Sequence, residues 1–198
     1  ALIYIKQENY KQALYILQKI IQIDENNSQA YYLLSSIYYK QENMEKYQEY
    51  LLKAYTKNPQ NEDYVYLLAQ IYIKEEKYVK AREILDQIQK KSPKILQNLG
   101  IVQIFEQKYE DALLNFQKIL DQNVFDGDVF FQMSLIYQKQ GLGNKAERFL
   151  HKAILLEPYN ITYYKKIVEF YFQKGEIEKT RKILEYFEKL QRIQRGTF

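Results

Sequence analysis

Residues 127–160 read GDVFFQMSLIYQKQGLGNKAERFLHKAILLEPYN, and this stretch decides the fold. Phe130 is followed at +3, +4 and +7 by further residues of the same helix face. Gly141 then marks a turn, and a second apolar series with helical spacing follows it. The pattern predicts a helix, a turn and a second helix. In order, its positions are Phe130, Met133, Ser134, Tyr137, Ala146, Leu150, Ala153 and Pro158.

The same pattern returns before and after this stretch. The position that opens each second helix recurs with spacings of 34, 34, 31, 34 and 34 residues and is small everywhere except at Tyr47: Ala13, Tyr47, Ala81, Ala112, Ala146 and Thr180. A second row needs small residues where two helices cross closely: Ala1, Ser35, Ala69, Gly100, Ser134 and Val168. A third row is large and apolar, as a core position demands: Leu17, Leu51, Leu85, Phe116, Leu150 and Leu184. The chain is therefore predicted to be a helical repeat array.

The order of these residues resembles the tetratricopeptide repeat (TPR), a unit of about 34 residues that reads W-x2-L-G-x2-Y, then A-x3-F, then P. The resemblance implies an all-α fold, in which antiparallel helix pairs stack into a right-handed superhelix, an α-solenoid. We expect one array over residues 1–198, with a partial first repeat at 1–27, repeats at 28–61, 62–92, 93–126 and 127–160, and a last repeat at 161–194 that ends in a capping helix.

Punctuating residues mark the ends of the repeats. Pro59, Pro93 and Pro158 fall at the boundaries, where proline cannot continue a helix but suits the first turn of the next one. Ser92 is predicted to cap the helix that begins at Pro93. Because the third repeat is three residues short, we expect its second helix to be followed by the helix that begins at Pro93 with almost no linker between them. Gly196 is interpreted as the final helix stop.

Composition excludes several classes of protein. The chain has no cysteine, which excludes disulfides, thiolate zinc sites and cysteine catalysis. The longest apolar run has six residues, Tyr64 to Ala69, far too few to span a membrane. The formal charge of +4 comes from residues 161–198, which hold nine Lys or Arg against five Asp or Glu. Any electropositive surface should therefore lie near the C-terminal end.

No catalytic, cofactor-binding or metal-binding residues are predicted, and we do not expect an enzyme. His151 is the only histidine, and one histidine without a second ligand nearby does not make a usual zinc site. The segment from Asp121 to Gln132 superficially resembles a calcium loop, but it has Asp126 where glycine is required and Gln132 where glutamate is required. We instead expect Asp126 or Asp128 to cap a helix.

The candidate site is a protein-binding groove. In the TPR family the first helices line a concave surface through their positions 2, 5, 9 and 12, which lie on one helix face. Carried over, this stripe is rich in aromatic, amide and aliphatic side chains. The predicted groove residues are Tyr32, Ser36, Tyr39, Tyr66, Gln70, Ile73, Gln97, Ile101 and Phe131. We expect a non-catalytic scaffold that binds a peptide segment or a helix of a partner protein within a larger complex.

Three alternatives bear on this function. Some TPR proteins clamp a chaperone's C-terminal carboxylate, but only Lys94 and Asn98 match part of that clamp here. The groove could instead pack against another part of the same longer chain. A helical array can also bind RNA, and the basic residues available for this lie in the last helix: Lys179, Arg181, Lys182, Lys189, Arg192 and Arg195. The first 160 residues are charge-neutral, which disfavours RNA.

Amino-acid usage bears on the source. Gln, Lys, Ile, Asn and Tyr are abundant, and four of these five have AT-rich codons. The excess of glutamine suits a lineage that reads stop codons as glutamine, such as a ciliated unicellular eukaryote. Such a source would favour a role in a ciliary assembly, and the location that we expect is cytoplasmic and possibly ciliary. The partial first repeat is interpreted as the start of a fragment of a longer protein.

Overall fold

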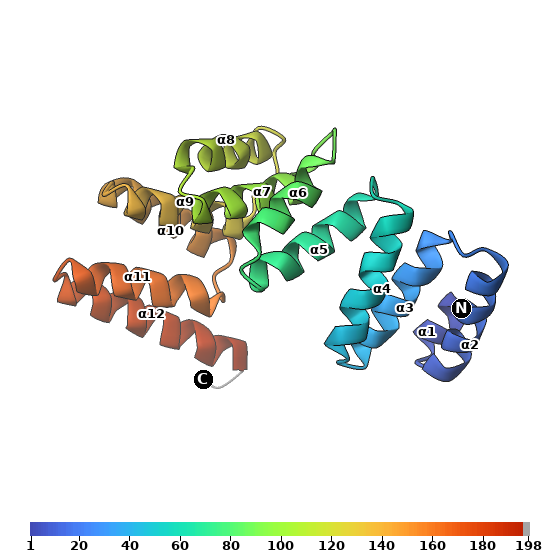
Figure 1. The fold of residues 1–198 in the computed structure, drawn as a ribbon. Coiled ribbons are helices and arrows are strands. Elements are labelled where there is room, and N and C mark those ends of the chain that lie inside the picture. The colour runs from blue at the N-terminus through green and yellow to red at the C-terminus, as the bar shows by residue number, and fades with distance from the viewer. Residues whose placement is uncertain (196–198) are drawn as a thin grey trace. The chain divides into compact units, whose positions relative to one another are not determined.

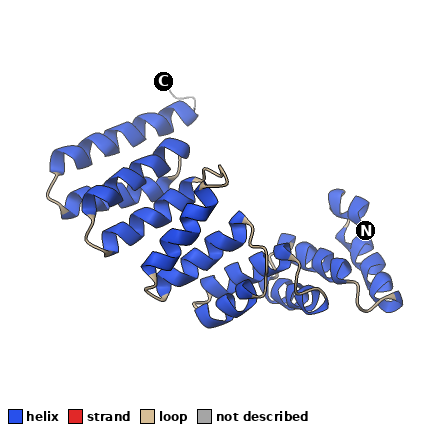
Figure 2. Cartoon of the chain, turned by 90° about the horizontal axis from the view of Figure 1, so that it is seen from above, coloured by secondary structure: helices blue, strands red, loops and turns tan. Residues whose placement is uncertain are grey.

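The computed structural model describes residues 1–195, in which helices alternate with short turns and no strand occurs (Figure 2). The predicted all-α fold of stacked helix pairs is confirmed. Helices joined by a turn pack side by side, as α3 does with α4 and α9 with α10 (Figure 1). The helices are α1 (Leu2–Lys6), α2 (Tyr10–Ile23), α3 (Ser28–Lys40), α4 (Met44–Lys57), α5 (Glu62–Lys74), α6 (Tyr78–Asp86), α7 (Pro93–Phe105), α8 (Tyr109–Leu120), α9 (Gly127–Lys139), α10 (Gly143–Leu156), α11 (Ile161–Gln173) and α12 (Ile177–Arg195).

The helices group into two compact bodies. The N-terminal body comprises residues 1–106 and holds α1 to α7, and the C-terminal body begins at residue 107 and holds α8 to α12. In stacked hairpins each helix packs mainly on its neighbours in sequence, so the apolar core is spread along the chain. The single array over residues 1–198 stays a prediction.

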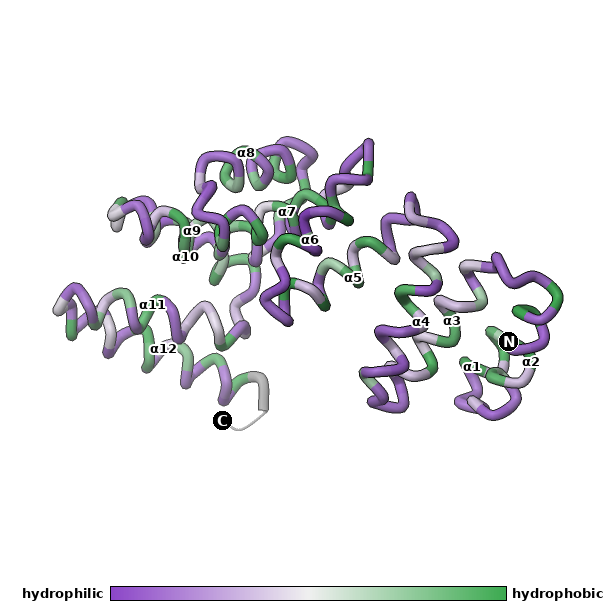
Figure 3. Tube along the Cα trace, viewed as in Figure 1, coloured by the Kyte–Doolittle hydropathy of each residue, from purple (hydrophilic) through white to green (hydrophobic). Residues whose placement is uncertain are grey.

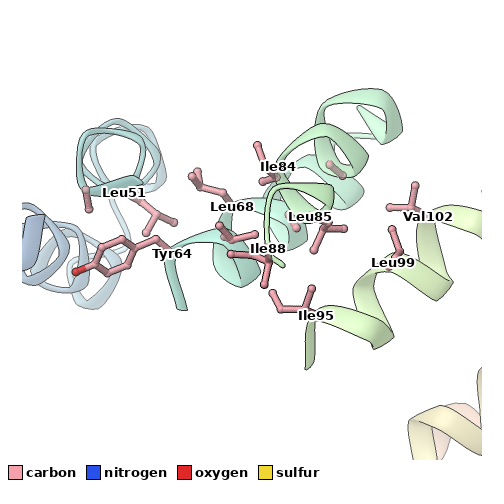
Figure 4. Packing of buried hydrophobic residues seen from close by; sticks show 13 residues of the cluster. Leu51, Tyr64, Leu68, Ile84, Leu85, Ile88, Ile95, Leu99 and Val102 are labelled. Carbon is pink, nitrogen blue, oxygen red and sulfur yellow. The ribbon is translucent and has the colours of Figure 1, made fainter. Parts of the chain in front are cut away.

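Each body has its own core of aliphatic and aromatic side chains. Apolar and polar residues alternate along the helices, which leaves one face of each for packing (Figure 3). In the N-terminal body the side chains of α4 to α7 meet in one cluster, with Leu51, Tyr64, Leu85 and Val102 among its members (Figure 4). A second cluster joins α2 and α3, and a third joins α9, α10 and α11.

The repeated rows are buried where the sequence predicts a close crossing. Ala13, Ala81, Ala112 and Ala146 are buried, and so are the small residues of the other row from Ser35 to Ser134. The two buried serines are satisfied locally, because Ser35 Oγ donates to the Tyr32 carbonyl at 2.7 Å and Ser134 Oγ donates to the Phe131 carbonyl at 2.6 Å. Small side chains thus let the helices approach without an unpaired hydroxyl.

The prediction that the large apolar row is buried fails at one of its six residues. Leu17, Leu51, Leu85, Phe116 and Leu150 are at most 2% exposed, as predicted. Leu184 of α12 occupies the same position, yet 46% of it is exposed. The first five lie on hairpins that are followed by the first helix of another hairpin. Among the described residues no such helix follows α12, so the prediction of a core position is wrong for Leu184.

The turn inside each hairpin repeats one backbone conformation. The residues at its centre have φ between 57° and 74°: Glu8, Glu42, Glu76, Gln107, Gly141 and Gly175. In most of these turns a following backbone N–H donates back to a carbonyl near the end of the first helix, as Asn43 does to Tyr38 at 2.9 Å. Gly141 does mark a turn, as predicted, and Gly175 marks the corresponding turn of the last hairpin. The sequence does not reveal the other four, because they are glutamate or glutamine.

The third repeat is shortened in a way that the sequence analysis did not predict. α6 has nine residues, whereas α4 and α10 have 14. Residues 87–92 are not helical, so α6 is joined to α7 by a real linker, and the expected direct handover is wrong. The missing residues are removed from the helix itself, while Ile88 of the linker is buried in the core. Packing therefore fixes the linker in place of a longer helix.

Helix capping agrees with the sequence at most first helices. Asn27, Asn61, Asp126 and Asn160 each accept a hydrogen bond from a backbone N–H of the helix that follows. Ser92 stands at the N-cap position of α7, but its side chain makes no cap hydrogen bond, so this prediction is wrong. The predicted stop at Gly196 lies outside the described residues.

Candidate protein-binding surface

The predicted groove residues fall on the first helices of their hairpins. Tyr32, Ser36 and Tyr39 lie on α3, Tyr66, Gln70 and Ile73 lie on α5, and Gln97 and Ile101 lie on α7. All eight are half-buried or exposed, and all belong to the N-terminal body. Phe131 lies on α9 of the C-terminal body, where its ring stacks on Tyr163 with centroids 4.9 Å apart. We therefore build the candidate site from the eight residues on α3, α5 and α7.

Tyr66 is held at the middle of this stripe by polar contacts. Gln70 donates from Nε2 to the Tyr66 hydroxyl at 2.8 Å, one helical turn along α5. From α7, Lys94 places its ammonium 5.8 Å from the centre of the Tyr66 ring. Asn98 is buried and donates from Nδ2 to the Tyr66 carbonyl at 3.1 Å. These contacts fix the packing of α5 on α7 and orient the ring before any ligand arrives.

The two residues that match part of a carboxylate clamp are engaged in the fold. Lys94 forms an ion pair with Asp63 of α5. The amide of Asn98 is used by the Tyr66 carbonyl and is shielded from solvent. A C-terminal carboxylate would compete with Asp63 for Lys94 and would find the Asn98 amide already used within the fold. The structure therefore gives no support to carboxylate-clamp recognition.

An open pocket of about 430 Å³ lies between α3, α4 and α5. Two of the predicted groove residues, Tyr39 and Gln70, line it. The Tyr39 and Tyr47 rings form an aromatic wall, with centroids 5.1 Å apart and planes inclined at 57°. Burial, with the neighbouring phenols Tyr39 and Tyr32, raises the pKa of Tyr47. The pocket combines aromatic, aliphatic and amide groups, the mixture typical of peptide-binding surfaces.

The repeat pattern does not predict the other residues of this pocket. Met44, Tyr47 and Gln48 come from the first turns of α4. Leu67, Ile71, Lys74 and Glu75 come from the middle of α5 and its C-terminal end. The sequence did contain one indication of the pocket: Tyr47 is the one large residue at the position that opens each second helix. The ring leans toward Tyr39 and forms the wall of the pocket.

The repeat sequence itself matches a known family. Residues 4–46 and 48–99 match the tetratricopeptide repeat family. The chain is a tetratricopeptide repeat protein. The part matched contains α3, α4 and α5, so the pocket is built by TPR hairpins.

Solved structures with the TPR fold resemble the whole chain. PilF of Pseudomonas aeruginosa is 19% identical, with a TM-score of 0.72 over 98% of this chain and 89% of that one. PilW, a type IV pilus biogenesis factor, is 15% identical, with a TM-score of 0.74 over 96% and 88%. YrrB, a TPR protein with an unusual peptide-binding site, is 17% identical, with a TM-score of 0.62 over 88% and 92%. No curated protein matches the sequence. At these identities the structures show a shared fold.

The calcium-like segment of this TPR protein has structural roles. Asp126 accepts a hydrogen bond from the Asp128 N–H at 2.8 Å and caps α9, as predicted. Asp128 accepts from the Tyr163 hydroxyl at 2.6 Å. Burial and this hydrogen bond raise the pKa of Tyr163, which keeps the phenol protonated as the donor. Asp126 thus stabilises the start of α9, and Asp128 stabilises the contact of α9 with α11.

His151 is exposed on α10 and belongs to a hydrogen-bonded group with Tyr171 and Glu147. Its Nε2 lies 2.9 Å from the Tyr171 hydroxyl, which also donates to Glu147 at 2.9 Å. Within the described residues no group of three or more His, Cys, Asp or Glu side chains could hold a metal ion. In the same part of the chain, no helix combines the length and apolar character needed to cross a membrane.

The basic residues of α12 are largely paired with acids. Lys179 lies 2.7 Å from Glu176, and Arg181 lies 2.8 Å from Glu178. Lys182 also approaches Glu178, at 3.8 Å. Neighbouring carboxylates therefore neutralise much of the basic stripe on which the RNA-binding alternative depends. The side chain of Arg195, a further member of that stripe, lies outside the described part of the chain.

Proposed function

We propose that this TPR protein is a non-catalytic scaffold that binds a peptide segment or helix of a partner protein on the surface of α3, α5 and α7. The pocket between α3, α4 and α5 carries the proposal, because it unites an aromatic wall with amide and aliphatic groups in a rigid frame. Tyrosine offers a large contact area at low entropic cost, and glutamine can hold a peptide backbone. The partner is recognised through the interior of its sequence, since Lys94 and Asn98 are engaged within the fold.

The surrounding surface supports recognition of an extended stretch of partner. Tyr32 packs on Tyr64 with ring centroids 5.2 Å apart, and the Tyr64 hydroxyl donates to Gln29 at 3.2 Å. Tyr66 and Gln70 continue the same surface along α5. A ligand seated in the pocket can therefore follow a row of ordered tyrosine and glutamine side chains. Membership of a larger complex and a cytoplasmic or ciliary location stay predictions, since neither the fold nor the similar structures bear on them.

A peptide-display selection tests the proposal. A random peptide library would be selected on the whole chain, and the affinity of the enriched peptides measured by calorimetry. Tyr39→Ala should weaken binding at least tenfold, because it removes a half-exposed ring from the pocket wall. Tyr15→Ala is the matched control, since Tyr15 of α2 is similarly exposed but lies outside the pocket. Equal affinity of the Tyr39→Ala variant and the unaltered protein for every selected peptide would show that the pocket is not the binding site.

A further inference from the structure

The pocket occupies one of five equivalent places in the chain. At each place the second helix of one hairpin faces the C-terminal end of the first helix of the next. With the repeat spacings of 34 and 31 residues, the positions of Gln48 and Glu75 have direct counterparts. The facing residues are Leu14 and Gln41, Gln48 and Glu75, Arg82 and Glu106, Leu113 and Gln140, and Glu147 and Lys174.

Charges at these two positions complement one another elsewhere in the chain. Arg82 donates from Nε to Oε1 of Glu106 at 2.7 Å and donates from Nη2 to Oε2 of the same carboxylate. With the signs reversed, Glu147 lies 3.4 Å from Lys174. At the two places where leucine faces glutamine, neither residue is charged. Glu75 is therefore the one charged residue of the series that faces a neutral side chain, Gln48.

The same comparison explains why a pocket is open at this place. One repeat later, the Tyr78 ring stacks on the Phe105 ring with centroids 4.2 Å apart. Met44 and Lys74 hold the corresponding positions at the pocket, and neither supplies a ring. The pocket thus lacks both the aromatic filling and the guanidinium that occupy the next interface. The pocket also has Tyr47 at the position where the next repeat has Ala81.

We propose that the pocket receives an arginine side chain of the bound peptide, an inference that rests on the proposed function. The guanidinium takes the place that Arg82 fills in the next interface and pairs with Glu75. Its plane packs on the Tyr47 ring, a contact that favours arginine over lysine. The apolar stem of the arginine lies against Met44 and Ile71.

Two lysines near Glu75, Lys74 and Lys77, compete with a bound arginine for its carboxylate. Lys77 donates to Oε2 of Glu75 at 2.8 Å from the same turn. Half of the Lys77 side chain is exposed, so this pair contributes little and an arginine with two parallel donors displaces it. Lys74 is exposed at the rim, where solvent screens its charge and the flexible side chain can turn away. The bound guanidinium is thus the stronger partner for Glu75.

Methionine NMR can observe this site directly. The chain has two methionines, Met44 in the pocket and Met133, which is buried in the C-terminal body. With ¹³C-methyl methionine in the whole chain, N-acetyl-arginine amide should shift the Met44 signal saturably and leave Met133 unchanged. N-acetyl-norleucine amide, which has a similar stem without the guanidinium, should shift Met44 at least tenfold less effectively. Equal effects of the two probes on Met44, or no shift with arginine, would overturn the proposal.

Charge variants separate the role of Glu75 from a general electrostatic effect. Glu75→Gln should weaken the arginine probe at least tenfold, while Glu76→Gln removes the same charge one residue away and should leave its affinity unchanged. Gln48→Arg should rebuild the arrangement of Arg82 and Glu106 inside the pocket. This variant is expected to melt at the same or a higher temperature and to lose the probe. Unaltered probe affinity in both Glu75→Gln and Gln48→Arg would contradict the inference.

The peptides selected in the preceding experiment distinguish this inference from the proposed function. Replacing their arginines by norleucine should reduce affinity for the unaltered protein and have little effect on Glu75→Gln. If the peptides depend on Tyr39 while their affinity is unaffected by norleucine in place of arginine and by Glu75→Gln, the inference is wrong and the scaffold function stands. If no selected peptide depends on Tyr39, the proposed function itself fails.

Discussion

A left-handed backbone conformation at one residue closes each hairpin. Glutamate or glutamine holds it in the first four hairpins, although a side chain in this region of φ costs about 1–2 kcal/mol. The cost is tolerated because the turn satisfies the last carbonyls of the first helix. Gly141 and Gly175 reach the same conformation without strain. The later hairpins thus combine the same turn with a lower local cost.

Gly141→Ala should lower the free energy of unfolding by about 1 kcal/mol. No atom lies within 4 Å of a Cβ added at Gly141, so the loss comes from the backbone and not from a clash. Urea unfolding followed by circular dichroism measures it. Gly143→Ala is the control, because Gly143 begins α10 and its added Cβ would meet Phe170 at 3.7 Å, an ordinary contact. A Gly141→Ala variant as stable as Gly143→Ala would refute the strain argument.

At the scale of elements, one carboxylate ties three helices of the C-terminal body together. Glu147 of α10 accepts a hydrogen bond from Tyr171 of α11 at 2.9 Å, and its carboxylate lies 3.5 Å from Lys179 of α12. Burial by itself raises the pKa of Glu147, but the hydrogen bond from Tyr171 and the charges of Lys179 and Lys174 outweigh it and lower the pKa below 4.5. Burial and Glu147 also raise the pKa of Tyr171, which keeps the donor protonated.

Glu147→Gln should destabilise the protein by about 1 kcal/mol at neutral pH, because the ion pairs are lost while an acceptor remains. A lowered pKa means that the folded state holds the ionised form more tightly than the unfolded chain. This contribution is therefore present above pH 4.5 and is lost as the pH falls through the folded-state pKa.

Unfolding measured between pH 7 and pH 3 should accordingly show a smaller loss of stability in Glu147→Gln than in the unaltered protein. Glu83→Gln, at an exposed position of α6, serves as the control and should follow the unaltered protein. Parallel pH profiles for all three proteins would show that Glu147 does not link these helices energetically.

For the whole molecule, charge distribution decides between a protein partner and a nucleic acid. The net charge of +4 is small for 198 residues, and glutamates pair with Lys179, Arg181 and Lys182 of α12. Phosphate recognition needs a continuous basic stripe whose counterions are released on binding. In α12 the basic stripe is instead interrupted by Glu178, Glu185 and Glu188.

Retention on a heparin or poly(U) column should therefore be absent at about 0.1 M salt, where screening is moderate. The dependence of any weak affinity on salt measures the phosphate contacts. A log–log slope of several units would indicate as many ion pairs and would favour the RNA alternative. The double variant Lys179→Gln and Lys182→Gln should behave like the unaltered protein if no such surface exists.

The sequence by itself determined the repeat register, the helix pairs and most of the core, because each 34-residue unit repeats one set of local constraints. Small residues at crossings, apolar residues at helical spacing and Asn at caps all act within one hairpin. The same register placed Tyr39 and Gln70 on the surface that carries the pocket.

Tertiary structure alone decided what happens between hairpins. It shortened α6, left Leu184 exposed, and brought Gln48 of one hairpin opposite Glu75 of the next. These outcomes depend on which helix follows and on which side chains fill the space between neighbours. A repeat pattern describes each unit by what it shares with the others, whereas the pocket arises where Met44, Tyr47 and Gln48 depart from it.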